Sequence, residues 1–516
     1  MKSVMNHQFS QIPSAEIPRS AFNRSHGHKT TFDSGYLVPF FVDEALPGDT
    51  FSLQASLFAR MSTPIVPIMD NLYLETFFFA VPVRLVWDNW QKFNGEQRNP
   101  NDSTDFLVPT VNSVAGFDEL SIHDYFGLPT KVANLEVCAF WHRAYNLIWN
   151  EWFRDENLQS SLTVETGDGP DAIPYTLQKR NKRHDYFSSC LPWPQKGPGV
   201  ELPLGTSAPI RGQFKVADGA GTWASVLNNT QTTGQIVATP AGGATEPIWA
   251  DYLKSNALYA DLSNATAATI NSLREAFQVQ RLLERDARGG TRYTELLKSH
   301  FGVTSPDSRL QRPEYLGGSS SAINISSVAQ TSETGTKTPQ GNLAAFGTAS
   351  AHFHGFSKSF TEHMVLIGLV NVRADLNYQQ GLRRMWSRQT RYDFYWPALA
   401  NLGEQSVLNK EIYAQGTASD DQIFGYQERW AEYRYFPSII TGRFRSTSTL
   451  PLDVWHLAQN FTSLPALNTT FITENPPVKR CLAVQTEPEF IFDSYISLKC
   501  ARPMPIYSVP GLIDHF

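Results

Sequence analysis

Alternating apolar and polar residues predict β-strands near both ends of the chain. Between Thr50 and Phe58 every second residue is apolar, which is the period of a strand with one buried face. An aromatic run at Asn71–Val83 predicts a longer strand that ends near Pro82, because proline cannot continue a central strand. Further strands are predicted at Tyr36–Val42, Met364–Val372, Phe424–Phe436 and Tyr495–Arg502. With strands at both ends, we expect a sandwich whose termini pair in one sheet.

Apolar residues spaced three and four positions apart predict two helices in the long segments between the strands. The first covers residues 135–152, and the second covers residues 270–283 with a stop at Gly289-Gly290. The apolar positions are Leu135, Cys138, Trp141, Tyr145, Ile148 and Trp152 in the first helix, and Ile270, Leu273, Phe277 and Leu283 in the second. A parallel α/β fold would alternate strands and helices regularly, which this sequence does not do. We therefore expect an all-β fold with long loop insertions that contain a few helices.

Three segments differ in composition from the rest of the chain. Residues 1–30 contain several cations and two prolines without a periodic pattern, and we expect an extended N-terminal arm. Residues 205–247 are rich in Gly, Ala, Thr and Asn and carry almost no charge, which favours a β-rich surface insertion. Residues 319–350 are rich in Ser, Thr and Gly, and we expect an irregular loop there.

The composition is that of a protein that buries much of its surface against partners. Of the 516 residues, 41% are hydrophobic and 12% aromatic, while only 18% are charged. Abundant aromatic residues with scarce charge exclude global disorder and are typical of a chain with extensive interfaces. The net charge of −6 means that any contact with nucleic acid must depend on a local basic patch.

The cysteines and the apolar runs predict a soluble chain made in the cytosol. Cys138, Cys190, Cys481 and Cys500 lack the spacing of a zinc or redox motif, and we expect reduced, buried thiols. The first twenty residues have no apolar segment typical of a secretory signal. The longest apolar runs are far shorter than the ~20 residues that a transmembrane helix needs, so we expect no such segment.

No recognised catalytic motif is present, and we expect no enzyme activity, cofactor or metal. Two histidine pairs, His26 with His28 and His352 with His354, would each lie on one face of a strand, but a third ligand is missing. Glu428 and Glu432 follow Asp420 and Asp421 and leave a second hypothesis open, a carbohydrate-active β-sandwich enzyme or lectin.

Basic residues set among aromatic residues are candidates for contact with single-stranded DNA. Rings stack on bases and cations pair with phosphates in sequence-tolerant binding of single strands. Arginine also stabilises protein–protein interfaces, so subunit contact is the alternative at each cluster. The DNA-contact candidates are Arg19, Arg24, Lys29, Lys179, Arg180, Lys182, Arg183, Arg383, Arg384, Arg388 and Arg391.

Several long sequence blocks together resemble the major capsid protein of the Microviridae, in particular its gokushovirus branch. They occur in order along nearly the whole chain, and the resemblance is weakest at 205–260. The blocks are Leu85–Phe93, Tyr145–Asn157, Leu191–Gly197, Arg288–Tyr293, Phe301–Val303, Gln311–Gly318, Phe424–Gln427, Glu432–Arg434 and Pro437-Ser438.

The resemblance implies a single eight-stranded jelly roll over residues 31–516, with large insertions between strands. It implies sixty copies in a T=1 icosahedral shell around circular single-stranded DNA, in a virus that infects bacteria. The implied partners are further copies of the chain, the DNA genome, other virion and scaffolding proteins and the bacterial surface. The protein would be found in the virion, and in the host cytoplasm during assembly.

The resemblance also implies that the insertion at 205–247 forms a protrusion at each threefold axis. Apolar residues on an isolated exposed loop would reduce solubility, whereas three copies that meet at an axis can bury them together. The candidates for this contact are Trp223, Val226, Ile236 and Val237.

Overall fold

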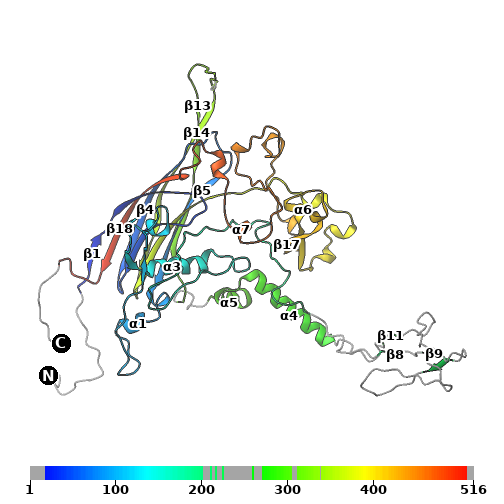
Figure 1. The fold of residues 1–516 in the computed structure, drawn as a ribbon, viewed down its shortest axis with the longest axis horizontal. Coiled ribbons are helices and arrows are strands. Elements are labelled where there is room, and N and C mark those ends of the chain that lie inside the picture. The colour runs from blue at the N-terminus through cyan, green and yellow to red at the C-terminus, as the bar shows by residue number, and fades with distance from the viewer. Residues whose placement is uncertain are drawn as a thin grey trace. The chain divides into compact units, whose positions relative to one another are not determined.

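The computed structural model describes residues 18–200, 210–211, 215–217, 223–225, 259–260, 270–304, 311–336 and 339–507. The chain divides into two compact units, each described here by itself. Unit 1 comprises Met1–Pro194 and Gly290–Phe516, and unit 2 comprises Gln195–Gly289. Figure 1 shows the elements of both units.

The first sheet of unit 1 brings the two ends of the chain together. Its strands are antiparallel and follow the order β1-β18-β4-β14-β13, and β2 also pairs with β18. The strands are β1 (Ser20–Asn23), β2 (His26–Phe32), β4 (Thr50–Met61), β13 (Asn324–Ala329), β14 (Leu343–Ser359) and β18 (Phe490–Arg502). The prediction that strands from both termini share one sheet is therefore confirmed. Since β1 and β2 belong to this sheet, the boundary that we placed at residue 30 for an extended arm is wrong.

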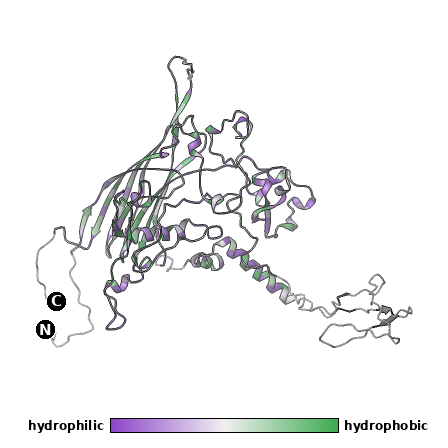
Figure 2. Cartoon of the chain, in the orientation of Figure 1, coloured by the Kyte–Doolittle hydropathy of each residue, from purple (hydrophilic) through white to green (hydrophobic). Residues whose placement is uncertain are grey.

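The second sheet is also antiparallel, in the order β12-β5-β15-β3. Its strands are β3 (Val38–Ala45), β5 (Leu72–Pro82), β12 (Glu314–Ala322) and β15 (Met364–Ala374). Every residue of β15 is buried, whereas the buried and exposed residues of β4 alternate. Figure 2 shows the corresponding mixture of hydrophobic and hydrophilic residues along the strands.

An aromatic core fills the space between the two sheets. Phe32 packs against Phe490 and Phe492, and Phe40 packs against Phe78 and Phe492, with ring centroids 5.6–5.9 Å apart. All five rings are at most 3% exposed. Burial of each such side chain contributes about 1.5–3 kcal/mol, so these contacts are a main reason why the sheets stay together.

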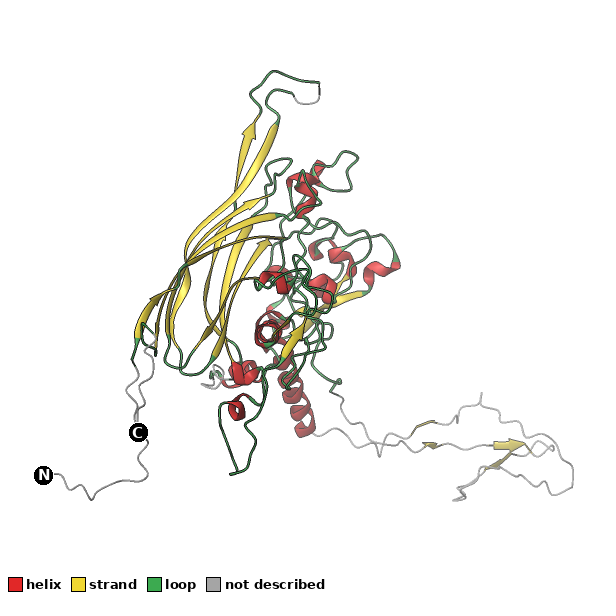
Figure 3. Ribbon diagram, turned by 60° about the vertical axis from the view of Figure 1, so that its left-hand side comes forward, coloured by secondary structure: helices red, strands yellow, loops and turns green. Residues whose placement is uncertain are grey.

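Short helices of unit 1 cover the other face of the second sheet. α3 (Phe140–Ile148) packs against β15 and β5. Figure 3 distinguishes the helices from the strands by colour. The predicted helix over residues 135–152 was too long at its start, because β7 (Glu136–Cys138) pairs with β6 (Thr110–Asn112). The helix continues past Ile148 as a π-helical turn, Trp149–Phe153.

The segment between β15 and β18 contains a hairpin with a small core of its own. β16 (Glu404–Leu408) pairs with β17 (Ile423–Glu428). The strand predicted over Phe424–Phe436 ends at Glu428, because Trp430 adopts a left-handed conformation with φ 67° and turns the chain. The core of this region consists of Tyr186, Phe187, Cys190, Val407, Ile412, Phe424 and Phe471.

The irregular loop predicted at residues 319–350 is wrong. Most of this segment lies in β12, β13 and β14. Its small residues are needed where strands approach closely: a Cβ atom on Gly318 would lie 2.0 Å from the carbonyl oxygen of Thr76. Ala345 and Ala349 of β14 are also buried. Because small residues give little hydrophobic contrast, their alternation is hard to see in the sequence.

The other elements of unit 1 are short, except for α5. The helices are α1 (Trp90–Phe93), α2 (Ile122–Tyr125), α5 (Tyr293–Phe301), α6 (Asn409–Ile412) and α7 (Thr469–Ile472). Short 3-10 turns include η1 (Val83–Leu85), η5 (Arg384–Trp386), η6 (Arg391–Asp393), η7 (Pro397–Leu399), η8 (Ala418–Asp421), η9 (Ala431–Tyr433), η10 (Gly442–Phe444), η11 (Asp453–Trp455) and η12 (Val478–Cys481).

The described residues of unit 2 form one long helix and two pairs of very short strands. α4 (Ile270–Gly289) confirms the second predicted helix and its stop, and Gly290 follows with φ 90°. β8 (Ile210–Arg211) pairs with β11 (Tyr259–Ala260), and β9 (Lys215–Ala217) pairs with β10 (Trp223–Ser225). Of the protrusion candidates, Trp223 lies in β10. Val226, Ile236 and Val237 lie outside the described residues.

Candidate DNA-contacting and assembly surfaces

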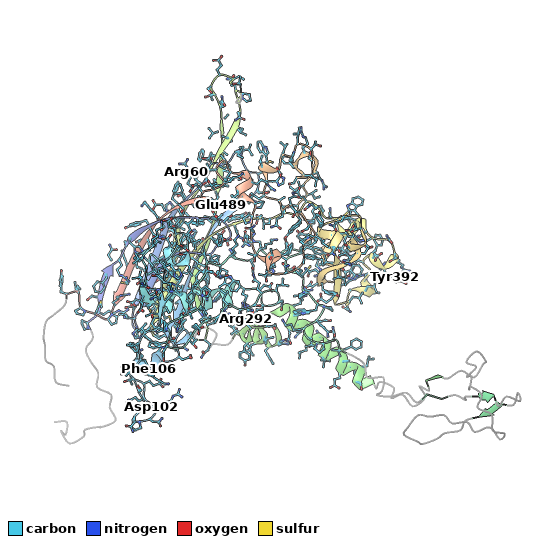
Figure 4. All side chains as sticks on the ribbon, in the orientation of Figure 1. Arg60, Asp102, Phe106, Arg292, Tyr392 and Glu489 are labelled. Atoms are coloured by element: carbon cyan, nitrogen blue, oxygen red, sulfur yellow. The ribbon has the colours of Figure 1, made fainter. Side chains whose placement is uncertain are left out.

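Exposed aromatic rings and arginines gather on two segments between β15 and β18. We call residues 383–396 and 429–445 the arginine–aromatic surface. Its most exposed rings are Trp386, Tyr392 and Phe436, each about 70% exposed. Tyr392 lies at the outer edge of this region (Figure 4). Trp, Tyr and Arg are the residues that dominate binding surfaces, which makes this surface the first candidate site.

Three of the four arginines predicted here from the sequence lie over aromatic rings. The guanidinium carbon is 4.0 Å from the ring centre for Arg383 over Phe436, and 4.6 Å for Arg391 over Trp396. Arg388 lies 4.3 Å from the ring centre of Tyr433. These contacts stabilise the surface and fix the planes of the guanidinium groups.

Arg384 is held by a buried carboxylate rather than by a ring. It donates hydrogen bonds to Glu411 at 3.1 Å and to the backbone oxygen of Ser406 at 2.7 Å. Burial raises the pKa of Glu411, although Arg384 and a hydrogen bond from the Leu408 amide oppose that shift. The contacts of Arg384 therefore stabilise the fold of this region.

The arginine–aromatic surface is locally basic in an acidic chain. Its two segments contain eight arginines and only two acidic residues, Asp393 and Glu432, whereas the whole chain has a net charge of −6. Glu432 pairs with Arg388 at 3.6 Å. The excess of positive charge fits an anionic partner.

A pocket of about 660 Å³ opens within this surface. Its lining includes Tyr186 and Phe187 from the small core and Trp386, Tyr433 and Phe436 from the surface itself. Charged residues also line it: Arg383, Arg384, Arg388, Glu432, Arg434 and Arg445 from the two segments, and Glu411 from α6.

The predicted cluster at residues 179–183 is largely engaged within unit 1. Lys182 is buried, donates to Gln459 at 2.9 Å, and lies 4.0 Å from the ring centre of Phe471. Burial lowers its pKa to about 8. The two arginines pair with acids and Lys179 with an amide: Arg180 with Glu75, Arg183 with Asp375, and Lys179 with Asn475.

The three N-terminal cations also have partners in the subunit. Arg24 forms two hydrogen bonds to Asp43, at 2.6 and 3.0 Å. Lys29 pairs with Asp493 across the first sheet at 3.3 Å, and Arg19 donates to the Thr50 hydroxyl at 2.6 Å. Lys29 remains 78% exposed, so it is accessible to a further partner.

An apolar patch that we did not predict from the sequence lies on the outer face of the first sheet. Phe58, Ile491 and Tyr495 occupy exposed positions of β4 and β18, with exposures of 46–57%. Phe353 is 82% exposed and has φ 64°, at a bulge where β14 has one more residue than β4. The sequence did contain a signal: large apolar residues stand at strand positions that alternate with the buried ones and are usually polar. Such a patch is typical of a surface that another molecule covers.

The bulge also separates His352 from His354, which we expected on one face. His354 is buried between the hydroxyls of Thr76 at 2.9 Å and Ser321 at 3.1 Å. His352 is exposed and lies 3.3 Å from Ser56. The residues described by the structure contain no group of three or more side chains arranged to bind a metal.

The carboxylates that suggested a glycosidase are ion-paired. Glu428 pairs with Arg434, and Glu432 accepts a hydrogen bond from Gln405 at 2.7 Å besides its contact with Arg388. Within the described part of the chain, helices that are long and apolar enough to cross a membrane are absent.

Comparison with known proteins identifies the family. A sequence model described as capsid protein (F protein) matches residues 10–512. Capsid protein VP1 of Bdellovibrio phage phiMH2K is 52% identical over 526 aligned positions, which cover 99% of this chain and 98% of that protein. VP1 of Chlamydia phage 1 is 47% identical over 591 positions, covering 99% and 98%. VP1 of Spiroplasma virus 4 is 39% identical over 545 positions, covering 98% and 97%. The predicted resemblance to gokushovirus capsid proteins is thereby confirmed, and the chain belongs to the phage capsid protein (F protein) family.

Proposed function

We propose that the chain assembles as sixty copies into a T=1 icosahedral shell that encloses the circular single-stranded DNA of a small bacteriophage. Family membership supports the capsid role. The observation that carries the DNA contact is the arginine–aromatic surface, with eight arginines against two acids. Sixty copies of a chain with net charge −6 would repel a polyanion unless basic residues face it.

We propose that the two sheets form a single eight-stranded jelly roll. The chain passes from β2 in the first sheet to β3 in the second, then to β4 in the first and β5 in the second. It later passes from β12 in the second sheet to β14, β15 and β18, changing sheet at each step. A jelly roll consists of two such Greek keys, and the extra strands β1 and β13 extend the first sheet at its ends.

The apolar patch on the first sheet fits a role in assembly. Phe58, Phe353, Ile491 and Tyr495 expose rings and methyl groups that water solvates poorly. In a shell, a second copy would cover them, and we expect each subunit to bury well beyond the ~800 Å² per partner of a standard interface. Other virion and scaffolding proteins are further partners during assembly in the host cytoplasm.

Residues 205–247 are proposed to form the protrusion at the threefold axis and to contact the bacterial surface. Their scarce charge and low complexity support a loop that does not contribute to the hydrophobic core. Deletion of this segment should leave particles that form but attach poorly to cells. Particles that attach normally, or a subunit that no longer folds, would contradict this role.

The DNA contact is tested by neutralising exposed arginines of the surface. Arg391 and Arg443 are exposed, so Arg391→Gln with Arg443→Gln should preserve the fold and assembly. We expect less DNA per particle, measured as the ratio of absorbance at 260 and 280 nm. Lys131→Gln, which removes a cation paired with Glu119 at an exposed site, is the matched control. Unchanged DNA content in the double variant would contradict the assignment.

A further inference from the structure

We propose that the pocket of the arginine–aromatic surface receives an unstacked base of single-stranded DNA. This inference rests on the proposed function, since it specifies how the surface would contact DNA. The pocket volume of about 660 Å³ lies in the range of small-molecule sites and is ample for one nucleotide.

Buried and half-buried aromatic rings provide a rigid floor. Tyr186 stacks on Tyr435 with ring centres 5.6 Å apart and ring planes 8° apart. Tyr186 also donates its hydroxyl to Glu411 at 3.0 Å, and Phe187 packs edge-on against Tyr378 at 5.2 Å. All four rings line the pocket. Because these rings are locked by their neighbours, a base could enter without reorganising the floor.

The rim offers open ring faces for stacking. Trp386 is 69% exposed and Phe436 is 70% exposed, although both line the pocket. Arg383 lies over the Phe436 ring at 4.0 Å, so a guanidinium group covers part of one face of this ring. A base that stacks on such a rim would bring its own phosphate close to a guanidinium group.

The charges of the pocket match a nucleotide better than an apolar peptide. Five arginines and two glutamates line it, which leaves positive charge for phosphates. The carboxylate of Glu432 accepts one hydrogen bond, from Gln405, through Oε2. Its Oε1 lies 3.6 Å from Arg388 and 4.0 Å from Arg384, beyond ordinary hydrogen-bond length. A donor on the edge of a base could bond to this oxygen.

The pocket would therefore distinguish single-stranded DNA, whose bases are unpaired, from duplex DNA, whose bases are paired. In a duplex the bases are paired and stacked, so none can enter without the cost of extruding it. In a single strand that cost is small. We expect the surface to prefer single strands for this reason, in addition to any attraction between arginines and phosphates.

An abasic oligonucleotide separates the two contributions, because it keeps the phosphates and lacks the bases. Binding of the full-length purified chain to a labelled twelve-nucleotide oligothymidylate and to an abasic strand of equal length is measured by fluorescence anisotropy. We expect the abasic strand to bind about tenfold more weakly, which is within the range for loss of one stacked base. Trp386→Ala should abolish this difference. Tyr293→Ala, which removes an exposed ring of α5 outside both the arginine–aromatic surface and the pocket lining, should leave the ratio of the two affinities unchanged.

The outcomes show separately whether the pocket receives a base and whether the surface binds DNA at all. Equal binding of the two strands by the unsubstituted chain would overturn the proposal that the pocket receives a base. The proposed DNA contact of the surface would still hold. A ratio that Trp386→Ala does not change would also overturn it. If neither strand binds, the proposed DNA contact of this surface fails, and the pocket fails with it.

Discussion

The guanidinium group of Arg143 donates to the carboxylate of Asp171, with Nε 2.9 Å from Oδ2, and both side chains are at most 1% exposed. Arg143 also donates to the Val86 oxygen at 2.8 Å, and Tyr175 donates its hydroxyl to Asp171 at 2.6 Å. This buried network fastens α3 to the loops beside the second sheet. Its role is to hold α3 in place beside the second sheet.

Replacement of Asp171 should therefore destabilise the subunit strongly. Asp171→Ala leaves the Arg143 charge buried without its partner, and we expect the free energy of unfolding to fall by about 3–5 kcal/mol. Chemical denaturation of the unassembled subunit measures the change. Glu119→Gln breaks an ion pair with Lys131 in which both side chains are more than 60% exposed, and should change the stability little because water screens the pair. Similar losses in the two variants would contradict this account.

Glu474 should make the subunit less stable as the pH rises from 5 to 8. Its Oε1 accepts from the Ala374 amide at 2.9 Å, and Oε2 lies 3.8 Å from Arg373. Burial raises the pKa of Glu474 from its ordinary 4.5 to about 7, and burial also lowers the pKa of Arg373. The folded chain therefore keeps a proton that the unfolded chain releases between these values, so stability falls as pH rises through this window.

Glu474→Gln keeps the acceptor for Ala374 and removes the titration. Compared with this variant, the unsubstituted chain should lose about 2–3 kcal/mol of unfolding free energy between pH 5 and pH 8. Urea denaturation at several pH values measures the difference. Parallel pH profiles for the two chains would show that Glu474 is ionised throughout and would refute the prediction.

Phe353 is predicted to decrease stability and to promote assembly. Its φ of 64° is unfavourable for a bulky residue, and its ring is 82% exposed. Phe353→Gly should raise the free energy of unfolding by about 1 kcal/mol, because glycine adopts this conformation readily. Particle yield should fall, because the ring is lost from the proposed contact.

Phe58→Ser serves as the matched control for this prediction. Phe58 lies on the same face in regular β4, so its loss should reduce particle yield without a comparable gain in stability. Normal yield in both variants would show that the patch has no part in assembly.

Much of the sandwich could be predicted from the sequence, because β4 and β18 bury one face and expose the other. Segments in which neighbouring strands approach each other closely were predicted badly. At 319–350, small residues fit between neighbouring strands and leave no hydrophobic pattern. The strand expected beyond Glu428 is ended by the backbone conformation of Trp430, which the residue type does not reveal.

The candidate site was predictable only in part. Arg383, Arg384, Arg388 and Arg391 are close in sequence, so their grouping was visible. Their partners come from elsewhere: Glu411 and Phe436 reach the same pocket only through tertiary structure. The outer patch of the first sheet brings together residues almost 440 positions apart, such as Phe58 and Tyr495, through the pairing of β4 with β18.

The central claim is self-assembly into a closed shell, and particle mass tests it most directly. The chain is expressed in bacteria, and its particles are examined by analytical ultracentrifugation and electron microscopy. Sixty copies of a 57.9 kDa chain predict a protein shell of about 3.5 MDa with icosahedral symmetry. A stable monomer that cleaves or binds carbohydrate, or closed particles with a different number of copies, would contradict the account.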